Sequence, residues 1–278
     1  MQDSGQVLDK ARDSRRKRRQ LLNYLLASLI MLTELGNVVS WLIASQVIYW
    51  AGRRREALCL AMGVLASYIA STIVKYVTAL PRPPPTNWLV QVDSPYGFPS
   101  GHTAVAFFAA AYLSMKNRKA APLLALAAFV AYSRLALGVH YIRDLIGGAF
   151  IGVLIAFTFN CIEKRSVDEK LLDPLLFPLS FIAAGLLYLS FPTRPGLAGG
   201  SLAGLVISWR FSRLVRGRLG LPHMALGVLM ACLLLCAYST IELKEVRALV
   251  FLTFTTYPYI VHPSLFGGAS SSTTTIQA

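Results

Sequence analysis

Three short polar islands interrupt an otherwise apolar chain, and their side chains are the ones that could do chemistry. In order along the chain they hold Lys75 with Arg82; Ser100, Gly101 and His102; and Ser133, Arg134, His140 and Asp144. Fixed charge is unfavourable beside hydrocarbon, so ionisable side chains that recur where apolar segments end are most simply explained by one shared polar site. Cations grouped with imidazoles favour phosphate as the ligand of that site.

The residue types predict how phosphate would be held. Ser100 and Gly101 open an apolar segment, so the unpaired backbone N–H groups of a first helical turn, with the Ser100 hydroxyl, would face an anion. Gly101 would let phosphate approach the backbone closely. Lys75, Arg82 and Arg134 would hold the phosphoryl group and stabilise the extra negative charge of its transition state.

The third island predicts a nucleophile. His140 and Asp144 are four residues apart at the start of an apolar segment, so on a helix they share one face. The carboxylate would hold one imidazole N–H while the other nitrogen faces the substrate. His102, on a different segment, would protonate the departing oxygen and then activate water against a phosphohistidine. Ser133 is expected either to orient Arg134 or to contact the phosphate.

Composition places these islands in a membrane protein. Hydrophobic residues make up 55% of the 278 residues, only 14% are charged, and the mean hydropathy is +0.55. Soluble domains carry about 25% charged residues. The net charge of +14 comes from short clusters between apolar segments rather than from one polar face, which argues against a nucleic-acid partner.

The sequence predicts an all-α fold, a polytopic bundle with room for about eight or nine membrane-spanning helices. A basic tail, 1–20, precedes an apolar run that is too long for one straight span and contains Glu34 to Asn37 near its middle. We expect a break there, with 21–33 as an interfacial or tilted helix. The expected spans are 36–50, 57–78, 101–115, 120–137, 143–162, 174–191, 197–209, 222–240 and 246–265. The Gly, Ser and Thr-rich tail, 267–278, is expected to be flexible.

Basic clusters predict the orientation of the bundle. Arginine and lysine gather at 53–55, 116–119, 164–165 and 210–218, in alternate gaps between apolar segments. Such loops stay in the cytoplasm, so the intervening gaps, which hold the three islands, are predicted to lie on the extracytoplasmic or lumenal face. The same counting places the basic tail outside, against this bias, unless the first apolar run makes a re-entrant turn.

The islands together resemble a known three-part motif. Lys75, six residues, Arg82-Pro83; then Pro99-Ser100-Gly101-His102; then Ser133-Arg134, five residues, His140, three residues, Asp144 is similar to the signature of the type 2 phosphatidic acid phosphatases, or PAP2 lipid phosphate phosphatases. Every motif position matches. Three linked motifs in the right order are a specific signal.

The resemblance implies a catalytic transmembrane core at 21–165, further helices at 166–266, and removal of phosphate from a lipid without metal or cofactor. It implies His140 as nucleophile with Asp144, His102 as acid and base, and Lys75, Arg82, Ser100 and Arg134 on the phosphate. The substrate would be a lipid phosphate monoester or pyrophosphate: an isoprenyl pyrophosphate, phosphatidic acid or a sphingosine phosphate. The extra helices are similar to those of the sphingosine-1-phosphate phosphatases, and isoprenyl pyrophosphate phosphatases share the core.

Two other classes are open at this point. A transporter would show internal repeats and broken helices, and no repeat is evident. A non-catalytic lipid-binding relative is expected to lose His140 or His102, and both are present. Two further carboxylates are open as well: Glu34 is expected to cap or break a helix and Asp93 to be solvated, with substrate contact as the alternative for each.

Overall fold

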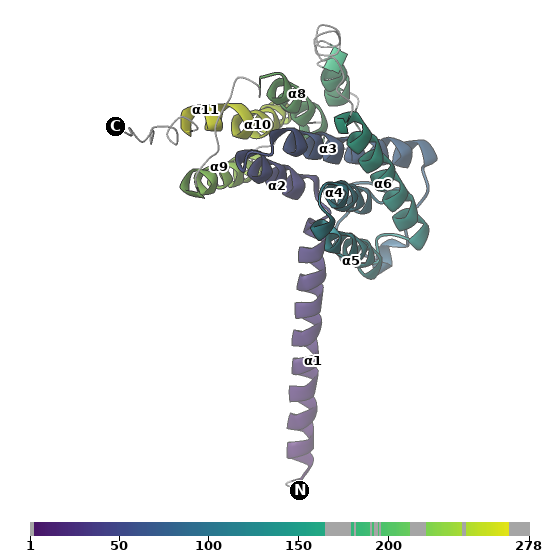
Figure 1. Ribbon diagram of the computed structural model, residues 1–278. Coiled ribbons are helices and arrows are strands. Elements are labelled where there is room, and N and C mark those ends of the chain that lie inside the picture. The colour runs from purple at the N-terminus through teal and green to yellow at the C-terminus, as the bar shows by residue number, and fades with distance from the viewer. Residues whose placement is uncertain are drawn as a thin grey trace, which may run out of the picture.

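The computed structural model shows a helical membrane protein (Figure 1). The structure describes residues 3–164, 179–180, 182–189, 191, 194, 196–211, 221–240 and 243–266. No strand occurs in these ranges, where the two isolated bridge partners are Pro81 and Tyr96. The predicted all-α bundle is confirmed, while the flexible tail 267–278 and residues 174–178, 181 and 190 of the expected span 174–191 lie outside the described residues.

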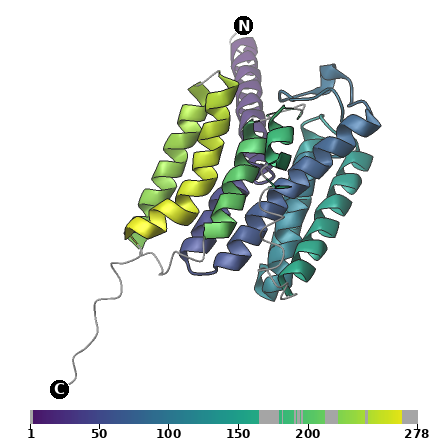
Figure 2. The ribbon, with the colours of Figure 1, turned by 90° about the horizontal axis from the view of Figure 1, so that it is seen from above.

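The first half of the chain supplies the helices that surround the polar islands. These are α1 Asp3–Glu34, α2 Val38–Trp50, α3 Arg54–Thr78, α4 Gly101–Lys116, α5 Pro122–Ala136 and α6 Ile142–Lys164, with the short turns η1 Pro85–Asn87 and η2 Arg118–Ala120. The second half supplies η3 Gly196–Gly200, α8 Ser201–Phe211, α9 Leu221–Thr240, α10 Lys244–Thr256, η5 Tyr257–Val261 and α11 His262–Phe266. Figure 2 shows this second half (green to yellow) packed beside α2 and α3.

The expected break in the first apolar run is present. Helix α1 ends at Glu34, and α2 starts at Val38, with the two axes bent by 58°. Asn37 caps α2, because its side-chain oxygen accepts a hydrogen bond from the Val39 backbone N–H at 3.1 Å. Residues 3–20, expected as a basic tail, continue helix α1, which projects from the bundle in Figure 1.

Helix α4 forms the centre of the bundle and packs against α3, α5 and α6. Glycines let the backbones approach: a Cβ on Gly152 of α6 would lie 2.3 Å from the Ala104 carbonyl oxygen of α4. A Cβ on Gly63 of α3 would likewise fall 1.9 Å from the fully buried Phe108 ring. The relative positions of α3, α4 and α6 therefore depend on close contacts that a larger side chain would disrupt.

Fewer helices reach spanning length than the roughly eight or nine that the sequence predicts. In the described part of the chain, three stretches are long and apolar enough: Arg54–Thr78, Arg118–Ala136 and Ile142–Cys161. The bent pair Arg16–Glu34 and Val38–Trp50 makes a fourth if it is one span. The 16 residues of α4 measure about 24 Å, less than the ~30 Å hydrocarbon layer. Because most of its side chains are buried in the protein, where it packs against α3, α5 and α6, α4 need not match the bilayer thickness.

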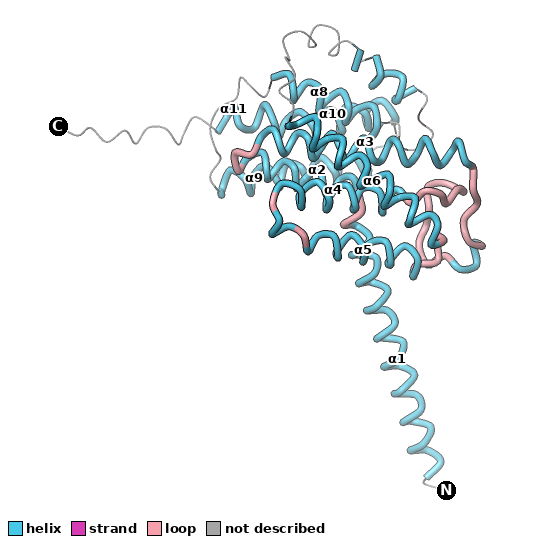
Figure 3. The backbone as a smooth tube through the Cα atoms, turned by 45° about the vertical axis from the view of Figure 1, so that its right-hand side comes forward, coloured by secondary structure: helices cyan, strands magenta, loops and turns pink. Residues whose placement is uncertain are grey.

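The polar islands meet at one end of the bundle. Helices α3 and α5 end there, while α2, α4 and α6 start there, so the turns after Trp50 and Lys116 lie at the opposite end. The long connection between α3 and α4, residues 79–100, covers the island end together with the short α5–α6 turn (pink in Figure 3). The conformation of this connection is held by backbone hydrogen bonds, such as the one that the Gly97 N–H donates to the Leu80 carbonyl at 2.8 Å.

Candidate active site

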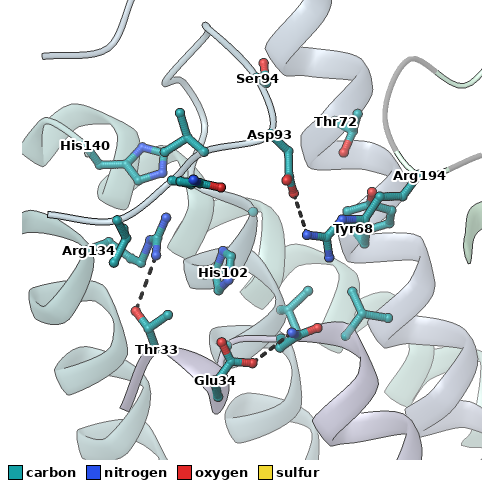
Figure 4. A pocket seen from close by; sticks show the side chains of 18 of the residues that line it. Thr33, Glu34, Tyr68, Thr72, Asp93, Ser94, His102, Arg134, His140 and Arg194 are labelled. Carbon is teal, nitrogen blue, oxygen red and sulfur yellow. Dashed lines mark hydrogen bonds and ion pairs between the residues drawn. The ribbon is translucent and has the colours of Figure 1, made fainter. Parts of the chain in front are cut away.

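A polar pocket of about 250 Å³ opens where these helix ends meet (Figure 4). Six of the predicted site residues line it: Lys75, Arg82, Gly101, His102, Arg134 and His140. They come from α3, the 79–100 connection, α4, α5 and the α5–α6 turn. The structure thus brings together residues from all three islands, and the cations and both imidazoles share one cavity.

His140 is held from both sides by charged partners. Its Nδ1 lies 3.2 Å from Asp144 Oδ2, and its Nε2 lies 3.0 Å from Arg82 Nη1. A guanidinium has only donors, so Nε2 must accept, and the ring proton then sits on Nδ1 and is donated to Asp144. The geometry selects a neutral imidazole whose lone pair is on the nitrogen beside the pocket cation.

The environment of His140 keeps its ring uncharged. The side chain is nearly fully buried, and this burial lowers the pKa of His140 below its ordinary value. The hydrogen bond to Asp144 opposes that shift, and the positive charge of Arg82 adds to it. Asp144 itself has no exposed surface and also accepts the Tyr141 backbone N–H at 3.0 Å, so its carboxylate is fixed in direction.

Arg82 is anchored by the connection in which it lies. Its Nε donates to the Ser94 carbonyl and its Nη1 to the Val139 carbonyl, each at 2.8 Å. Burial lowers the pKa of Arg82, but a guanidinium stays charged at any physiological pH. Arg82 therefore presents a fixed positive charge beside the Nε2 of His140.

Ser100 and Gly101 start α4, but they differ in their access to the pocket. Gly101 lines it, whereas Ser100 is fully buried and is not among the lining residues. The Ser100 hydroxyl oxygen accepts the Thr103 backbone N–H at 3.4 Å and the Thr103 hydroxyl at 3.0 Å, as an N-cap does. The Ser100 backbone N–H donates to the Asp144 carbonyl at 2.9 Å, which ties the start of α4 to α6.

Arg134 also lines the pocket and is tied to α1. Its Nη1 lies 3.5 Å from the Thr33 hydroxyl, which is in turn 2.8 Å from the Ser133 hydroxyl. Ser133 is fully buried and does not line the pocket, so it supports Arg134 indirectly. The Nε of Arg134 is buried and has no hydrogen-bond partner among the residues that the structure describes. An unpaired guanidinium donor beside the pocket is suited to an anion.

Of the lining residues outside the three islands, Thr33 and Arg194 were not predicted and have polar partners at the pocket. Thr33 joins α1 to Arg134, and Arg194, which precedes η3, lies 2.9 Å from the carboxylate of Asp93. The expectation that Asp93 is solvated holds in part, because it is exposed but ion-paired. Glu34 lines the pocket and accepts the side-chain N–H of Asn37 at 3.0 Å, in keeping with its expected place at the break.

Comparison with known proteins identifies the family. Residues 56–167 match the PAP2 superfamily. The undecaprenyl-diphosphatase of Sulfolobus acidocaldarius is 27% identical over 164 residues, which cover 55% of this chain and 80% of that protein. The bacitracin transport permease protein BcrC of Bacillus licheniformis is 32% identical over 137 residues, 46% of this chain and 68% of that protein.

A crystal structure is also similar, that of the transmembrane PAP2 type phosphatidylglycerolphosphate phosphatase from Bacillus subtilis. It has a TM-score of 0.45 and 22% sequence identity, over 52% of this chain and 79% of that one. The predicted family is confirmed by these sequence matches, and the residues 56–167 that match the PAP2 superfamily include all three islands. The chain is a multi-pass integral membrane protein that belongs to the PAP2 superfamily.

Proposed function

We propose that this protein hydrolyses a lipid phosphate or lipid diphosphate through a phosphohistidine on His140, at the extracytoplasmic end of the bundle. Family membership makes the chain a membrane phosphatase of lipid phosphates. The proposal adds the mechanism, the residues and the face. The observation that carries it is the arrangement of His140 between Asp144 and Arg82 at the wall of a cationic pocket.

In the first step, the Nε2 lone pair of His140 attacks phosphorus and the bond from phosphorus to the lipid oxygen breaks. That oxygen leaves with the bonding electron pair and takes a proton from His102 when it leaves as an alkoxide. An incoming phosphate oxygen would accept the N–H that Arg82 now donates to Nε2, which frees the lone pair. Asp144 keeps the Nδ1 proton in place and stabilises the ring as it becomes positively charged.

In the second step, His102 removes a proton from water, and the water oxygen attacks the phosphorus of the phosphohistidine. The phosphorus–nitrogen bond breaks, its electron pair returns to Nε2, and inorganic phosphate leaves. Lys75 and Arg134 would neutralise the phosphoryl oxygens in both steps, when the charge on the transferring group is largest. A transport function has no need of a neutral imidazole paired with a carboxylate, although one relative is named a permease.

The proposed face follows from charge. Arg53, Arg54, Lys116 and Lys119 lie at the turns opposite the pocket, where the positive-inside bias favours the cytoplasm. The pocket end is then extracytoplasmic or lumenal, which suits a lipid substrate entering from the outer leaflet.

The mechanism can be tested with para-nitrophenyl phosphate, whose leaving group needs no proton. Purified wild type and the His102→Gln variant are each mixed with the ester, which carries a radioactive label in its phosphate group. Each reaction is then stopped with alkali, because phosphohistidine is stable in alkali. We expect His102→Gln to accumulate label, because the first step proceeds without the acid while hydrolysis stalls. Peptide mapping should place the label on His140, and His140→Ala should show none. Label on another residue, or full turnover by His140→Ala, would refute the mechanism.

A further inference from the structure

The pocket has a second cationic end that the proposed chemistry does not use. Arg194 lies just before η3, outside the matched region 56–167, yet it lines the same cavity as His140. In Figure 4, His140 and Arg134 lie on one side of His102, and Arg194 and Asp93 lie on the other. Among the described residues, the cationic side chains that line the pocket are Lys75, Arg82, Arg134 and Arg194, and Figure 4 shows Arg134 and Arg194 on two sides of the His102 imidazole.

The geometry of in-line displacement indicates which part of the substrate would lie near Arg194. The nucleophile and the leaving oxygen lie on opposite sides of the phosphorus that is attacked. With His140 as nucleophile and His102 at the leaving oxygen, whatever lies beyond His102 belongs to the leaving group. A positive charge there matches a leaving group that is itself negatively charged. An alcohol has no such charge, whereas the phosphate of a lipid monophosphate does.

We infer that Arg194 binds the lipid-linked phosphate of a diphosphate substrate, and so makes this enzyme selective for lipid diphosphates. Attack by His140 on the terminal phosphorus breaks its bond to the bridging oxygen, which leaves with the electron pair on the lipid monophosphate. Arg194 would neutralise that departing phosphate, while Lys75, Arg82 and Arg134 hold the phosphoryl group that is transferred. This inference rests on the proposed function and names its substrate class.

The position of Arg194 is fixed by the backbone, while its present partner is easily replaced. Its carbonyl oxygen accepts the N–H groups of Leu197 and Ala198, at 3.0 and 3.2 Å, which anchors it to the first turn of η3. The side chains of Arg194 and Asp93 are 45% and 61% exposed. Ion pairs that exposed contribute little free energy, so a phosphate oxygen can displace the Asp93 carboxylate.

An apolar groove continues from the same end of the pocket. Tyr68 lines the polar pocket, and its ring centroid is 5.7 Å from that of Phe191, which lines the groove. The other groove residues come from α3 and the helical stretch 182–189: Ile73, Tyr76, Val77, Ala183, Leu186 and Leu187. This groove would hold the hydrocarbon of the leaving group, since it starts beside the phosphate that Arg194 would bind.

The test compares an isoprenyl diphosphate with the isoprenyl monophosphate of the same chain length, using the full-length protein in detergent. We expect Arg194→Gln to lower kcat/KM for the diphosphate by roughly ten- to a hundredfold. The fold-loss of kcat/KM for the monophosphate should be at least ten times smaller than the fold-loss for the diphosphate. Arg118→Gln removes the same charge at the opposite end of the bundle and should leave both values at the wild-type level. Asp93→Asn should keep the preference for the diphosphate, because it retains the cation.

The outcomes separate this inference from the proposed function. The role of Arg194 would be overturned if Arg194→Gln lost kcat/KM equally on both substrates or lost none on either. It would also be overturned if Asp93→Asn lost the preference for the diphosphate as much as Arg194→Gln does. A wild-type protein that hydrolyses only the monophosphate would overturn the substrate class but leave the phosphatase proposal intact. A pure, folded wild type that releases phosphate from neither lipid would refute the proposed function itself. Thermal unfolding of each variant shows that a lost rate is not a lost fold.

Discussion

At the scale of single residues, the proposed chemistry depends on which nitrogen of His140 carries a proton. The donors of Arg82 require an unprotonated Nε2, and Asp144 requires a protonated Nδ1. Both partners select the same neutral tautomer, because a guanidinium can only donate and a carboxylate can only accept. The arginine that was expected only to bind phosphate therefore also prepares the nucleophile.

This dual role of Arg82 predicts a shift in pH dependence. The positive charge of Arg82 lowers the pKa of His140, so removing it in Arg82→Gln raises that pKa. Because the neutral ring is the nucleophile, a higher pKa means that less of it is active at acid pH. We expect the acid limb of kcat/KM to move to higher pH in Arg82→Gln.

The measurement is kcat/KM from about pH 4.5 to 8, since His titrates near 6.5 when unperturbed. The same substrate serves for both proteins, so its own titration cancels. Arg143→Gln is the matched control, because Arg143 Nε lies 3.6 Å from Asp144 Oδ1 but its side chain is 52% exposed. An acid limb that stays in place in Arg82→Gln would mean that Arg82 does not act on His140.

At the scale of elements, the C-terminal end of helix α1 is part of the site, although most of the helix projects from the bundle (Figure 1). Thr33, near its end, contacts both the Ser133 hydroxyl and the Arg134 guanidinium. This contact joins α1 to α5 across a separation of 100 residues. We expect Thr33→Val to lower kcat/KM by roughly two- to tenfold, as the loss of a hydrogen bond worth about 0.5–1.5 kcal/mol implies.

Ser28→Ala is the matched control on the same helix. The Ser28 side chain is exposed, and its hydroxyl donates to the Tyr24 carbonyl of its own helix at 2.9 Å. Its loss should leave kcat/KM unchanged, as measured by phosphate release from one lipid substrate. Equal activity of Thr33→Val and wild type would show that α1 does not support Arg134.

The contact of α4 with α6 sets the distance between the two imidazoles, because His102 lies in the first turn of α4 and His140 lies just before α6. Gly152→Ala would place a Cβ 2.3 Å from the Ala104 carbonyl, which the backbone can relieve only by moving apart. Overpacking of this kind costs roughly 1–3 kcal/mol. We expect a lower thermal unfolding midpoint in detergent, together with lower kcat.

Gly185→Ala makes the same substitution where a Cβ would meet nothing within 4 Å. It should not lower the midpoint, because alanine favours the helix more than glycine does. If Gly152→Ala unfolded at the same temperature as Gly185→Ala, the close approach of α4 and α6 would not contribute to stability.

At the scale of the whole molecule, the sequence predicts the site residues that lie in short motifs at helix ends. It does not predict the residues that reach the pocket through packing between segments far apart in the chain. The island residues lie at or near helix ends, so their charge and their spacing along the chain are enough to indicate one shared site. The break near Glu34 is likewise readable from an apolar run too long for one span. Thr33 and Arg194 carry no such signal, because each reaches the pocket only through packing of segments far apart in the chain. The only hint for Arg194 is a charge between two prolines in an apolar region.

The span count is the least predictable property of the whole molecule. Hydropathy treats each apolar segment as if it met lipid, but α4 is enclosed by its neighbours and is only 16 residues long. Its start at Gly101 also lines the pocket. Helix α4 packs against the longer helices α3 and α6, and His102 lies in its first turn. Burial by protein thus replaces burial by lipid, a difference that composition alone cannot reveal.

The orientation of the molecule can be tested by labelling one residue at each end. Thr86 is exposed in η1 at the pocket end, and Lys119 is exposed in η2 at the opposite end. Each is changed to cysteine in a background without native cysteines, because Cys232 and Cys236 are exposed and would react as well. We expect a membrane-impermeant maleimide to label Thr86→Cys in intact cells and Lys119→Cys only after permeabilisation. The reverse pattern would place the pocket in the cytoplasm, and the substrate would then come from the inner leaflet although the chemistry at His140 stayed the same.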